Sequence, residues 1–360
     1  MTDRRIQVAI VGCGGIAFGK HLPALAKLEG VEVAAFCDVV ETNARKAAAE
    51  FGTADARVVT DYRDVMAMDN IDAVYVLTAN FLHATVSIAA LHAGKHVMCE
   101  KPMAMNSEEA ASMLQAAHET GKILTVGYQN RFRKDSRYLK AACEAGDLGH
   151  IYAAKAIAVR RRMVPTWGNF LSRELQGGGP LIDVGTHALD LTLWMMDNYE
   201  PKTVLGVTYD YLGTQGSSAN QWGPWDPEKY SVEDAAFALI TFQNGASVVL
   251  ESSWALNTLM TGEARTILHG TKAGADMVDG LRINGEKHGR LYTETPDLNV
   301  PSALLGSAVS EQAADVEAAH FIDCIRNETQ PIVKPEQALV VTKILEAVYE
   351  SASKGEPVPL

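Results

Sequence analysis

An alternation of short apolar runs with helical segments fills the first third of the chain, and it constrains the fold more than any other feature. Runs rich in Val, Ile and Ala recur there, at Ile6–Val11, Val31–Cys37, Ala73–Thr78, His96–Cys99 and Ile123–Val126. Helical spacing marks segments between them, at Ala17–Leu28, Glu41–Phe51 and Thr85–Ala93. Asn106, with Glu109 three residues on, resembles a capping box. Strands that alternate with helices predict parallel βαβ units and so a doubly wound parallel sheet.

The pattern changes after about Arg131, where strand candidates cluster. They lie at residues 151–160, 203–213, 235–243, 246–256, 264–269 and 281–284. The Asn-Gly pairs at 244–245 and 284–285 predict hairpins, which join antiparallel strands. A length of 360 residues suits two domains. We therefore predict a doubly wound α/β domain over 1–131, followed over 132–360 by an α+β domain with a large, mostly antiparallel open sheet.

A glycine-rich turn over residues 12–17 (GCGGIA) follows the first strand candidate. This Gly-x-Gly-x-x-Ala pattern is the Rossmann dinucleotide fingerprint when it lies between a strand and a helix. Gly12 permits the tight turn, and Gly14 lets the backbone approach a pyrophosphate. Gly15 and Ile16 open the helix whose free N–H groups favour the phosphates. A plain strand–turn–helix unit also shows such glycines, so further evidence is needed from the second strand.

An acidic residue, Asp38, ends the second strand candidate. A carboxylate there accepts hydrogen bonds from ribose hydroxyls and repels a 2′-phosphate. The residues that follow it, Val39 and Val40, offer no cation for such a phosphate. The sequence therefore favours NAD over NADP, bound by a Rossmann domain over 1–131.

Charge and hydropathy exclude several kinds of partner. Lys and Arg total 32 while Asp and Glu total 44, and the net charge of −12 would repel a nucleic acid. No apolar run approaches the length of a membrane span, and no signal peptide is visible. The five cysteines form no Cys-x-x-Cys pair, which predicts neither disulfides nor a zinc site. We expect a cytoplasmic protein without a nucleic-acid, membrane or metal partner.

Two further motifs carry side chains that can do proton chemistry. Glu100-Lys101-Pro102 follows a strand candidate, and the carboxyl ends of parallel strands border the ligand crevice. Asp183 and His187 are four apart after a glycine run, so both would project from one helical face. Each motif also has a structural interpretation, a turn for the first and a local surface contact for the second. The Asp/His pair has no apparent third ligand, so a metal site is not predicted.

Together these motifs resemble those of the Gfo/Idh/MocA oxidoreductases, relatives of glucose–fructose oxidoreductase and inositol dehydrogenase. The resemblance covers essentially the whole chain and includes the glycine turn and the segments 78–83 (TANFLH), 94–102 (GKHVMCEKP), 126–132 (VGYQNRF) and 178–187 (GGPLIDVGTH). The Glu-Lys-Pro and Asp-x-Gly-x-His blocks are highly specific as a pair. Ala79 departs from the proline that the family commonly has, which concerns the rigidity of that turn.

The resemblance implies roles for these positions. Lys101 would bind the reacting hydroxyl, His187 would remove its proton as hydride leaves the same carbon, and Asp183 would hold the substrate hydroxyls. Further contacts to NAD would come from Thr78, Asn80, His83, Glu100, Lys101 and Gln129. The family also implies a cis Lys101–Pro102 peptide and association through the open sheet as homodimers or homotetramers.

The substrate class is predicted from side chains in the later part of the chain. Residues that suit a sugar or polyol are Arg131, Arg161, Trp167 and Asn169, with Trp222, Trp225, Asp226 and Tyr230 in the long loop 213–233. For any single tryptophan, a position in the core or at a subunit interface is the more common alternative. The chain offers few clustered cations for a phosphorylated substrate. We predict a dehydrogenase that oxidises a secondary hydroxyl of a sugar, of a glycoside at C3 or of a cyclic polyol such as inositol. An NAD-dependent glycosidase, a sugar–sugar oxidoreductase with retained cofactor and a non-enzymatic dinucleotide-binding protein are the alternatives.

Overall fold

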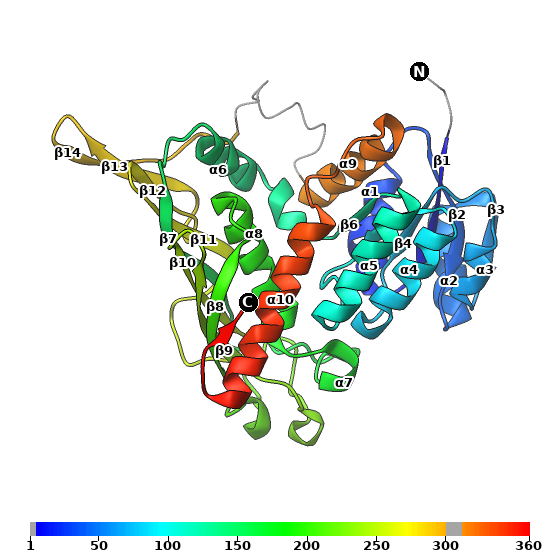
Figure 1. Cartoon of the computed structure of the whole chain (residues 1–360). Coiled ribbons are helices and arrows are strands. Elements are labelled where there is room, and N and C mark those ends of the chain that lie inside the picture. The colour runs from blue at the N-terminus through cyan, green and yellow to red at the C-terminus, as the bar shows by residue number, and fades with distance from the viewer. Residues whose placement is uncertain (1–4, 300–311) are drawn as a thin grey trace. The chain divides into compact units, whose positions relative to one another are not determined.

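The chain folds into two compact units. The computed structural model, drawn in Figure 1, describes residues 5–299 and 312–360. The first unit contains the described residues up to Phe132 and those of Val309–Leu339. The second contains the described residues of Arg133–Ala308 and those of Val340–Leu360. The predicted boundary after residue 131 lies next to the first break, but the prediction gave all of 132–360 to the second domain.

Helix α9 (Ala313–Asn327) is the part of the later sequence that belongs to the first unit. Its Phe321 and Ile322 are buried in the core formed with the first strands, and Phe321 lies edge-on to Tyr75 with ring centroids 5.6 Å apart. Burial of two such side chains contributes roughly 3–6 kcal/mol. No pattern within α9 ties these residues to a particular sheet, which is why the division by sequence differs from the structure here.

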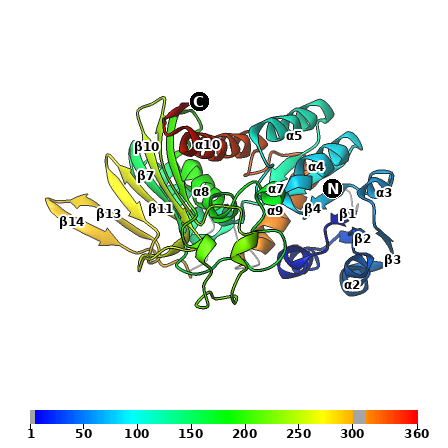
Figure 2. The same ribbon diagram turned by 90° about the horizontal axis from the view of Figure 1, so that it is seen from below.

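The first unit is built around a parallel sheet. Its described strands follow the order β3-β2-β1-β4-β5-β6 of a doubly wound dinucleotide-binding sheet. They are Ile6–Val11 (β1), Val31–Cys37 (β2), Gly52–Val59 (β3), Ala73–Val76 (β4), His96–Cys99 (β5) and Leu124–Val126 (β6). The helices are Leu22–Leu25 (α1), Glu41–Phe51 (α2), Tyr62–Met66 (α3), His83–His92 (α4) and Ser107–Thr120 (α5). Figure 2 shows α4 and α5 on one face of this sheet and α2 on the other.

Most predicted elements of this unit are confirmed. The strands β1, β2 and β5 and the helix α2 have the predicted bounds. At the start of α5, the Asn106 side chain accepts a hydrogen bond of 2.8 Å from the Glu109 N–H. Strand β3 and the short α3 are not predicted from the sequence pattern. Strand β3 lies at the sheet edge, is half exposed and carries few apolar residues, so it lacks the signal of a buried strand.

The second unit is built around a mixed sheet. Its described strands follow the order β14-β13-β12-β11-β7-β10-β9-β8-β15, and among them β7 and β10 run parallel while the other neighbours are antiparallel. They are Ile151–Val159 (β7), Pro201–Tyr209 (β8), Ala235–Phe242 (β9), Ser247–Ser253 (β10), Gly262–Gly270 (β11), Ala273–Asp276 (β12), Arg282–Lys287 (β13), Arg290–Glu294 (β14) and Val358–Pro359 (β15). The helices are Lys134–Glu144 (α6), Arg173–Gln176 (α7), Thr186–Met196 (α8) and most of Pro335–Lys354 (α10). The predicted fold class is confirmed.

One face of this sheet is covered and the other exposes apolar side chains. Helix α8 contacts β7 and β11 on the covered face, and Val204 and Ile240 on that face are fully buried. On the other face, Leu205, Leu239 and Val249 are neighbours across β8, β9 and β10 and are 44%, 43% and 38% exposed. The alternation of side chains along each strand separates the two faces.

The two predicted hairpins have different outcomes. The Asn-Gly pair at 244–245 forms the turn between β9 and β10 as predicted. The pair at 284–285 lies inside β13, and the turn to β14 follows at 288–289, where both residues have positive φ. A Cβ atom at Gly285 would lie 3.0 Å from the Tyr292 ring, so this glycine provides space and does not make a turn. The prediction of a hairpin at 284–285 is therefore wrong.

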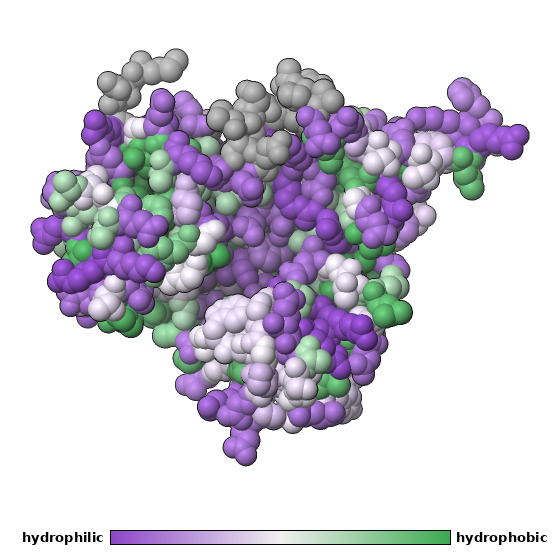
Figure 3. All heavy atoms as spheres, turned by 180° about the vertical axis from the view of Figure 1, so that it is seen from behind, coloured by the Kyte–Doolittle hydropathy of each residue, from purple (hydrophilic) through white to green (hydrophobic). Residues whose placement is uncertain are grey.

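The edge of this sheet at β14 is strongly polar. Lys287 of β13 and Glu294 of β14 form an ion pair, with Nζ 3.5 Å from Oε2. Figure 3 shows the protruding β13–β14 hairpin as mostly hydrophilic. Charged edge strands resist pairing with other sheets. None of the described helices is long and apolar enough to cross a membrane.

The predicted long loop joins β8 to β9 and builds a small core of its own. Trp225 is buried and its indole N–H donates to the Gly213 carbonyl oxygen at 2.6 Å, and Tyr230 is also buried. The buried amide of Asn220 accepts from the Val164 N–H at 2.8 Å and donates to the Val164 carbonyl oxygen at 2.9 Å. Trp225 and Tyr230 therefore stabilise the loop, which agrees with the core position that the sequence leaves open for each of the tryptophans.

Candidate functional site

The glycine turn lies at the carboxyl end of β1. Gly12 has φ +98°, and a Cβ atom there would lie 2.5 Å from the Leu77 carbonyl oxygen, so a side chain is excluded. Gly14 and Gly15 have no atom within 4 Å of a Cβ position, which leaves space for a ligand to approach the backbone. Ala17 is fully buried and brings the next helix close to the strand. This arrangement fits a bound pyrophosphate.

Asp38, at the end of β2, is fixed beside this turn. Its two carboxylate oxygens accept hydrogen bonds of 2.8 Å each, one from the Cys13 N–H in the turn and one from the Val40 N–H. Each oxygen keeps a second lone pair that can accept from a ribose hydroxyl. Ile16, which precedes the first helical segment, is exposed. The open backbone at the turn and the oriented acid beside it together fit NAD.

A second group of predicted residues follows β4. Thr78 and Asn80 are partly exposed, and Asn80 begins a short 3-10 helix that ends at Leu82. His83 is buried, with Nδ1 2.7 Å from the Pro102 carbonyl oxygen and Nε2 3.1 Å from the Thr78 carbonyl oxygen. It therefore joins the turn after β4 to the turn after β5. That His83 also borders the nicotinamide stays a prediction.

Ala79, where the family commonly has proline, has φ −66° and ψ 150°. Proline holds φ near this value, so Ala79→Pro is expected to stabilise the protein by about 0.4–1 kcal/mol, because it restricts the unfolded chain. Thermal unfolding of the two proteins would show the gain as a small rise in Tm. A fall in Tm would show that the turn depends on the Ala79 N–H or on a Thr78 conformation that a following proline disfavours.

The Glu-Lys-Pro motif follows β5 at the same edge of the sheet. The Lys101–Pro102 peptide is cis, as the resemblance implies. Lys101 is partly exposed, whereas Glu100 is buried and its carboxylate contacts Lys20, His21 and the Lys101 backbone N–H. Its carboxylate oxygens are thus engaged inside the unit, and its contact to the cofactor stays a prediction.

Lys20 lies between two buried carboxylates. Its ammonium is 2.7 Å from Glu100 Oε1 and 2.9 Å from Glu317 Oε2, which comes from α9. Burial alone would raise the pKa of Glu100, but Lys20 and His21 hold it well below its usual range. Burial raises the pKa of Glu317 to about 7, although Lys20 opposes the shift. Glu100 is therefore the permanently ionised partner of Lys20, and Glu317 titrates near neutrality.

This shift makes stability depend on pH. The ordinary pKa of Glu317 is 4.5 and the folded value is about 7, so the folded state binds more protons between these values and stability falls as the pH rises through them. At about 1.4 kcal/mol per pKa unit, the fall is on the order of 3 kcal/mol. Glu317→Gln should remove this component, so its Tm relative to the parent should rise between pH 5 and pH 8. A Tm difference independent of pH would contradict the shift.

Two more predicted residues follow β6. Gln129 is partly exposed at the start of a 3-10 helix that ends at Phe132. Arg131 is fully buried, and its guanidinium donates to the Ile332 carbonyl oxygen at 3.0 Å and to the Gln337 amide oxygen at 2.7 Å. Arg131 thus fastens the segment before α10 within the first unit. That Arg131 binds substrate stays a prediction.

The Asp-x-Gly-x-His motif begins the helix that packs on the second sheet. Leu181–Gly185 form a π-helical turn that continues directly into α8. Asp183 lies in the π-helical turn and His187 in the first turn of α8, four residues apart on one helical face. π-Helical turns inside helices are frequent at functional sites. Both side chains are partly exposed, and the Nδ1 atom of His187 is buried.

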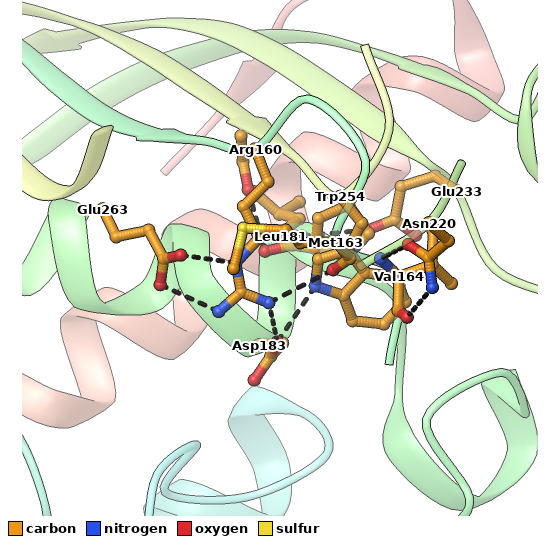
Figure 4. Close-up of polar contacts among 11 residues, drawn as sticks. Arg160, Met163, Val164, Leu181, Asp183, Asn220, Glu233, Trp254 and Glu263 are labelled. Carbon is orange, nitrogen blue, oxygen red and sulfur yellow. Dashed lines mark hydrogen bonds and ion pairs between the residues drawn. The ribbon is translucent and has the colours of Figure 1, made fainter. Parts of the chain in front are cut away.

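Two neighbours fix the orientation of Asp183 (Figure 4). The Trp254 indole N–H donates to Asp183 Oδ2 at 2.9 Å, and the Arg160 guanidinium lies 3.6 Å from the same oxygen. Arg160 also makes paired hydrogen bonds of 2.7 and 2.8 Å with Glu263. Burial alone would lower the pKa of Arg160, but Glu263 and Asp183 raise it, so the cation is kept. Trp254, Arg160 and Glu263 are functional candidates that no sequence motif indicates.

Glu233 closes the amino end of this helix, and no sequence motif indicates it either. Its carboxylate accepts hydrogen bonds of 3.0–3.1 Å from the Gly179 and Leu181 N–H groups and one of 2.8 Å from the Tyr349 hydroxyl. A Cβ atom at Gly178 would collide with the Tyr349 hydroxyl, and one at Gly179 with the Glu233 backbone. The glycine run therefore lets Glu233 and Tyr349 reach the start of the helix that carries Asp183.

Aromatic rings form a connected group next to Asp183. Trp167 lies 4.9 Å from Trp222 and 5.9 Å from Phe170 between ring centroids, and Phe170 lies 6.2 Å from Trp254. The Arg160 guanidinium lies over the Trp222 ring at 5.5 Å. Trp167 is 51% exposed, so one predicted substrate residue presents a large apolar surface to solvent. Such surfaces suit the apolar faces of a sugar ring.

Two other predicted substrate residues, Arg161 and Asn169, are exposed. Arg161 lines a cavity of about 670 Å³ together with Arg160, Arg162 and Glu263. The second unit thus combines a carboxylate, an imidazole, an arginine and exposed aromatic surface in neighbouring segments. This set of groups can bind polar hydroxyls and take up a proton.

The chain matches known oxidoreductases over nearly its whole length. Residues 6–128 match the model of an oxidoreductase family with an NAD-binding Rossmann fold, GFO_IDH_MocA, and residues 140–360 match the C-terminal alpha/beta domain of the same family. The fold and the glycine turn with Asp38 define an NAD-binding oxidoreductase. The chain belongs to the Gfo/Idh/MocA family and is an NAD-binding oxidoreductase.

Three similar proteins illustrate the range of the family. D-glucoside 3-dehydrogenase of Escherichia coli (strain K12) is 35% identical over 100% of this chain and 99% of its own. An aldose–aldose oxidoreductase from Caulobacter crescentus, solved with glycerol, is 25% identical, with a TM-score of 0.80 over 99% of this chain and 100% of that chain. Levoglucosan dehydrogenase, solved with NADH and levoglucosan, shares the fold at 22% identity, with a TM-score of 0.83 over 99% of both chains.

Proposed function

We propose that the protein is an NAD-dependent dehydrogenase that oxidises a secondary hydroxyl of a non-phosphorylated glycoside, sugar or cyclic polyol to a ketone. Oxidation of a glucoside at C3 is the preferred reaction. The observation that carries the proposal is the Asp183/His187 pair on one helical face, with Asp183 oriented by Trp254 and Arg160 beside exposed aromatic rings. The full-length similarity to a D-glucoside 3-dehydrogenase supports the choice of substrate and carbon.

In this proposal three side chains of the protein carry the reaction. His187 takes the hydroxyl proton as general base, while the C–H bond at the same carbon breaks and its electron pair leaves as hydride. NAD⁺, when bound, supplies the acceptor for that hydride. The Lys101 ammonium stabilises the negative charge that develops on the oxygen. Asp183 accepts hydrogen bonds from substrate hydroxyls and so fixes which carbon reacts.

The other residues would divide between cofactor and substrate. Gly12, Gly14, Gly15 and Ile16 would hold the pyrophosphate and Asp38 the adenosine ribose. Thr78, Asn80, Lys101 and Gln129, which are all partly exposed, would contact the nicotinamide half. Trp167, with Asn169 and Arg161 nearby in sequence, would bind the sugar ring.

A substrate panel tests the proposal. The purified protein would be incubated with NAD⁺ and with glucosides, free aldoses, inositols and sugar phosphates, and NADH would be followed by absorbance. NADH formation with a glucoside, and a 3-keto product by NMR, is expected. NAD⁺ binding without NADH from any polyol would overturn the dehydrogenase proposal.

The similarity to an aldose–aldose oxidoreductase favours one second candidate. A sugar–sugar oxidoreductase would retain its cofactor, oxidise one sugar and reduce another. Purified protein would then carry bound nicotinamide, and turnover would require two sugars and give no net NADH. A glycosidase that uses transient oxidation would be recognised by release of free sugar, again without net NADH.

We further propose that the exposed sheet face joins copies of this chain into a homodimer or homotetramer in the cytoplasm. Leu205, Leu239 and Val249 form a contiguous apolar row on that face, and exposed apolar patches of this kind mark association sites. Leu239→Asp should lower the molar mass measured by light scattering after gel filtration. Val39→Asp, at an exposed apolar residue of the first unit, is the control. An unchanged mass for Leu239→Asp would contradict this interface.

A further inference from the structure

Four titratable side chains are packed together inside the first unit, outside the set that the proposed reaction uses. Lys20 and His21 come from the helical segment that follows the glycine turn, Glu100 precedes Lys101, and Glu317 comes from α9. All four are buried. Glu100 Oε1 lies 2.7 Å from both Lys20 Nζ and His21 Nε2, and Lys20 Nζ lies 2.9 Å from Glu317 Oε2.

Glu100 connects this cluster to Lys101. Its second oxygen, Oε2, accepts a hydrogen bond of 3.2 Å from the Lys101 backbone N–H. A Cβ atom at Gly127 would lie 3.1 Å from Glu100 Oε1, so the glycine there makes room for the carboxylate. One side chain therefore links the helix after the dinucleotide turn to the peptide of the residue that would stabilise the developing charge.

Stabilisation of the fold does not account for this cluster. Taking a lysine and two carboxylates out of water costs free energy that their attraction repays only with good geometry, and apolar replacements are often neutral or stabilising. The same two chain segments are also bridged at the surface, where Lys27 Nζ lies 2.8 and 2.9 Å from the two Asp315 oxygens and is 57% exposed. The Lys27–Asp315 pair can hold α9 in place. Of these two bridges, only the one made by Lys20 and Glu317 also contacts Glu100.

We propose that Lys20 is a positioning residue for the reaction: by holding Glu100, it fixes the Lys101 peptide relative to the helix that follows the dinucleotide turn. The proposal rests on the role of Lys101 in the proposed function. Glu317 completes the arrangement by holding the Lys20 ammonium from the other side. His21 supplies a neutral contact to the same carboxylate, because burial and Lys20 lower its pKa.

The test compares three variants chosen to fold. K20M/E317M removes one cation and one anion, so Glu100 keeps His21 and the cluster keeps its formal charge. E317Q keeps the Lys20–Glu100 pair. K27M removes the surface bridge between the same segments. K20M/E317M should lower kcat by about 10–100-fold, because a small misplacement of a catalytic group has an effect of this size, with KM for the sugar and Kd for NAD nearly unchanged. K27M should keep the parent kcat, whereas E317Q, which replaces one of the two carboxylates around the Lys20 ammonium, should lower kcat by less than K20M/E317M does.

Two further readouts separate positioning from a general loss of packing. With Lys101 displaced, the rising limb of the kcat/KM–pH profile should move to higher pH in K20M/E317M and stay in place in K27M. Hydrogen exchange at the Lys101 amide should be faster in K20M/E317M than in the parent, whereas exchange at the β1 amides should be unchanged. An unaltered kcat and pH profile in K20M/E317M, or an equal loss in K27M, would overturn the proposal.

The exchange measurement also separates this inference from the proposed function. If the parent protein oxidises no polyol, the proposed function fails, and the exchange rate of the Lys101 amide still decides whether Lys20 holds that peptide. If the parent is active and Lys101 exchange is the same in K20M/E317M, the positioning role alone fails.

Discussion

Replacing His187 with asparagine should lower kcat for sugar oxidation by about 10²–10⁴-fold, the usual contribution of a general base. Asparagine keeps polar character at a partly exposed position in the first turn of α8, so the helix should persist. NAD binding should be retained, because the glycine turn and Asp38 belong to the first unit. Steady-state kinetics and a fluorescence titration with NAD would measure the two effects.

The pH profile provides the sharper test of this assignment. In the parent protein the oxidation rate should rise as the His187 imidazole loses its proton, since imidazoles titrate near neutrality. The variant should lose this rise. His269→Asn, at an exposed histidine on β11 of the same unit, is the matched control and should keep it. A parent rate that is flat from acid to alkaline pH would exclude His187 as the base.

Replacing Lys101 with methionine should lower kcat by about 10²–10³-fold, the effect of removing one group that stabilises charge in the transition state. Methionine retains the unbranched shape, and the Glu100 contact to the backbone N–H at position 101 does not depend on the side chain. The Kd for NAD should change little, because the pyrophosphate and ribose contacts lie at the glycine turn and Asp38. Single-turnover kinetics with saturating NAD would isolate the chemical step.

Lys122→Met, at another lysine of the first unit, is the control for loss of one positive charge. It should leave kcat and the Kd for NAD unchanged. A Lys101→Met protein that binds NAD poorly but turns over normally once saturated would assign Lys101 to cofactor binding and contradict its role at the reacting oxygen.

The elements that could be predicted from sequence are those whose signal is local. Strands such as Ile6–Val11 and Val31–Cys37 are apolar except for one residue each, Gln7 and Glu32, and their bounds agree with the prediction. Strands β3, β12 and β14 were missed because edge or half-exposed strands need no apolar run. The Asn-Gly pair at 284–285 predicts a turn, but Gly285 lies inside a strand and makes room for the Tyr292 ring. The pair looks the same in sequence in both situations.

The residues of the candidate site likewise fall into those that lie in local motifs and those that only the fold brings together. Gly12, Asp38 and Lys101 lie within short motifs, and their places at the ends of strands follow from the order of elements. Trp254 and Glu233 act on the helix of Asp183 through hydrogen bonds between residues 71 and 52–54 positions apart, which no local pattern records.

Sequence also does not say which way a side chain faces. His83, Glu100 and Arg131 occur in the right motifs, but each is buried and contacts groups of its own unit. These side chains hold turns and helices together, and their predicted contacts to ligands stay predictions. The partly exposed residues of the same motifs are Thr78, Asn80, Lys101 and Gln129. Their contacts to the cofactor are part of the proposed function.

The membership of α9 in the first unit has a consequence for engineering new specificities by recombination. A chimaera with one crossover near residue 132 would give the cofactor module a foreign α9 and exchange Phe321, Ile322 and Glu317. A graft that replaces the described residues between Arg133 and Asn299, with a second junction before α9, would leave those side chains native. A substrate specificity from another protein should therefore be introduced by replacing an internal segment, with one junction after the first unit's strands and a second before α9.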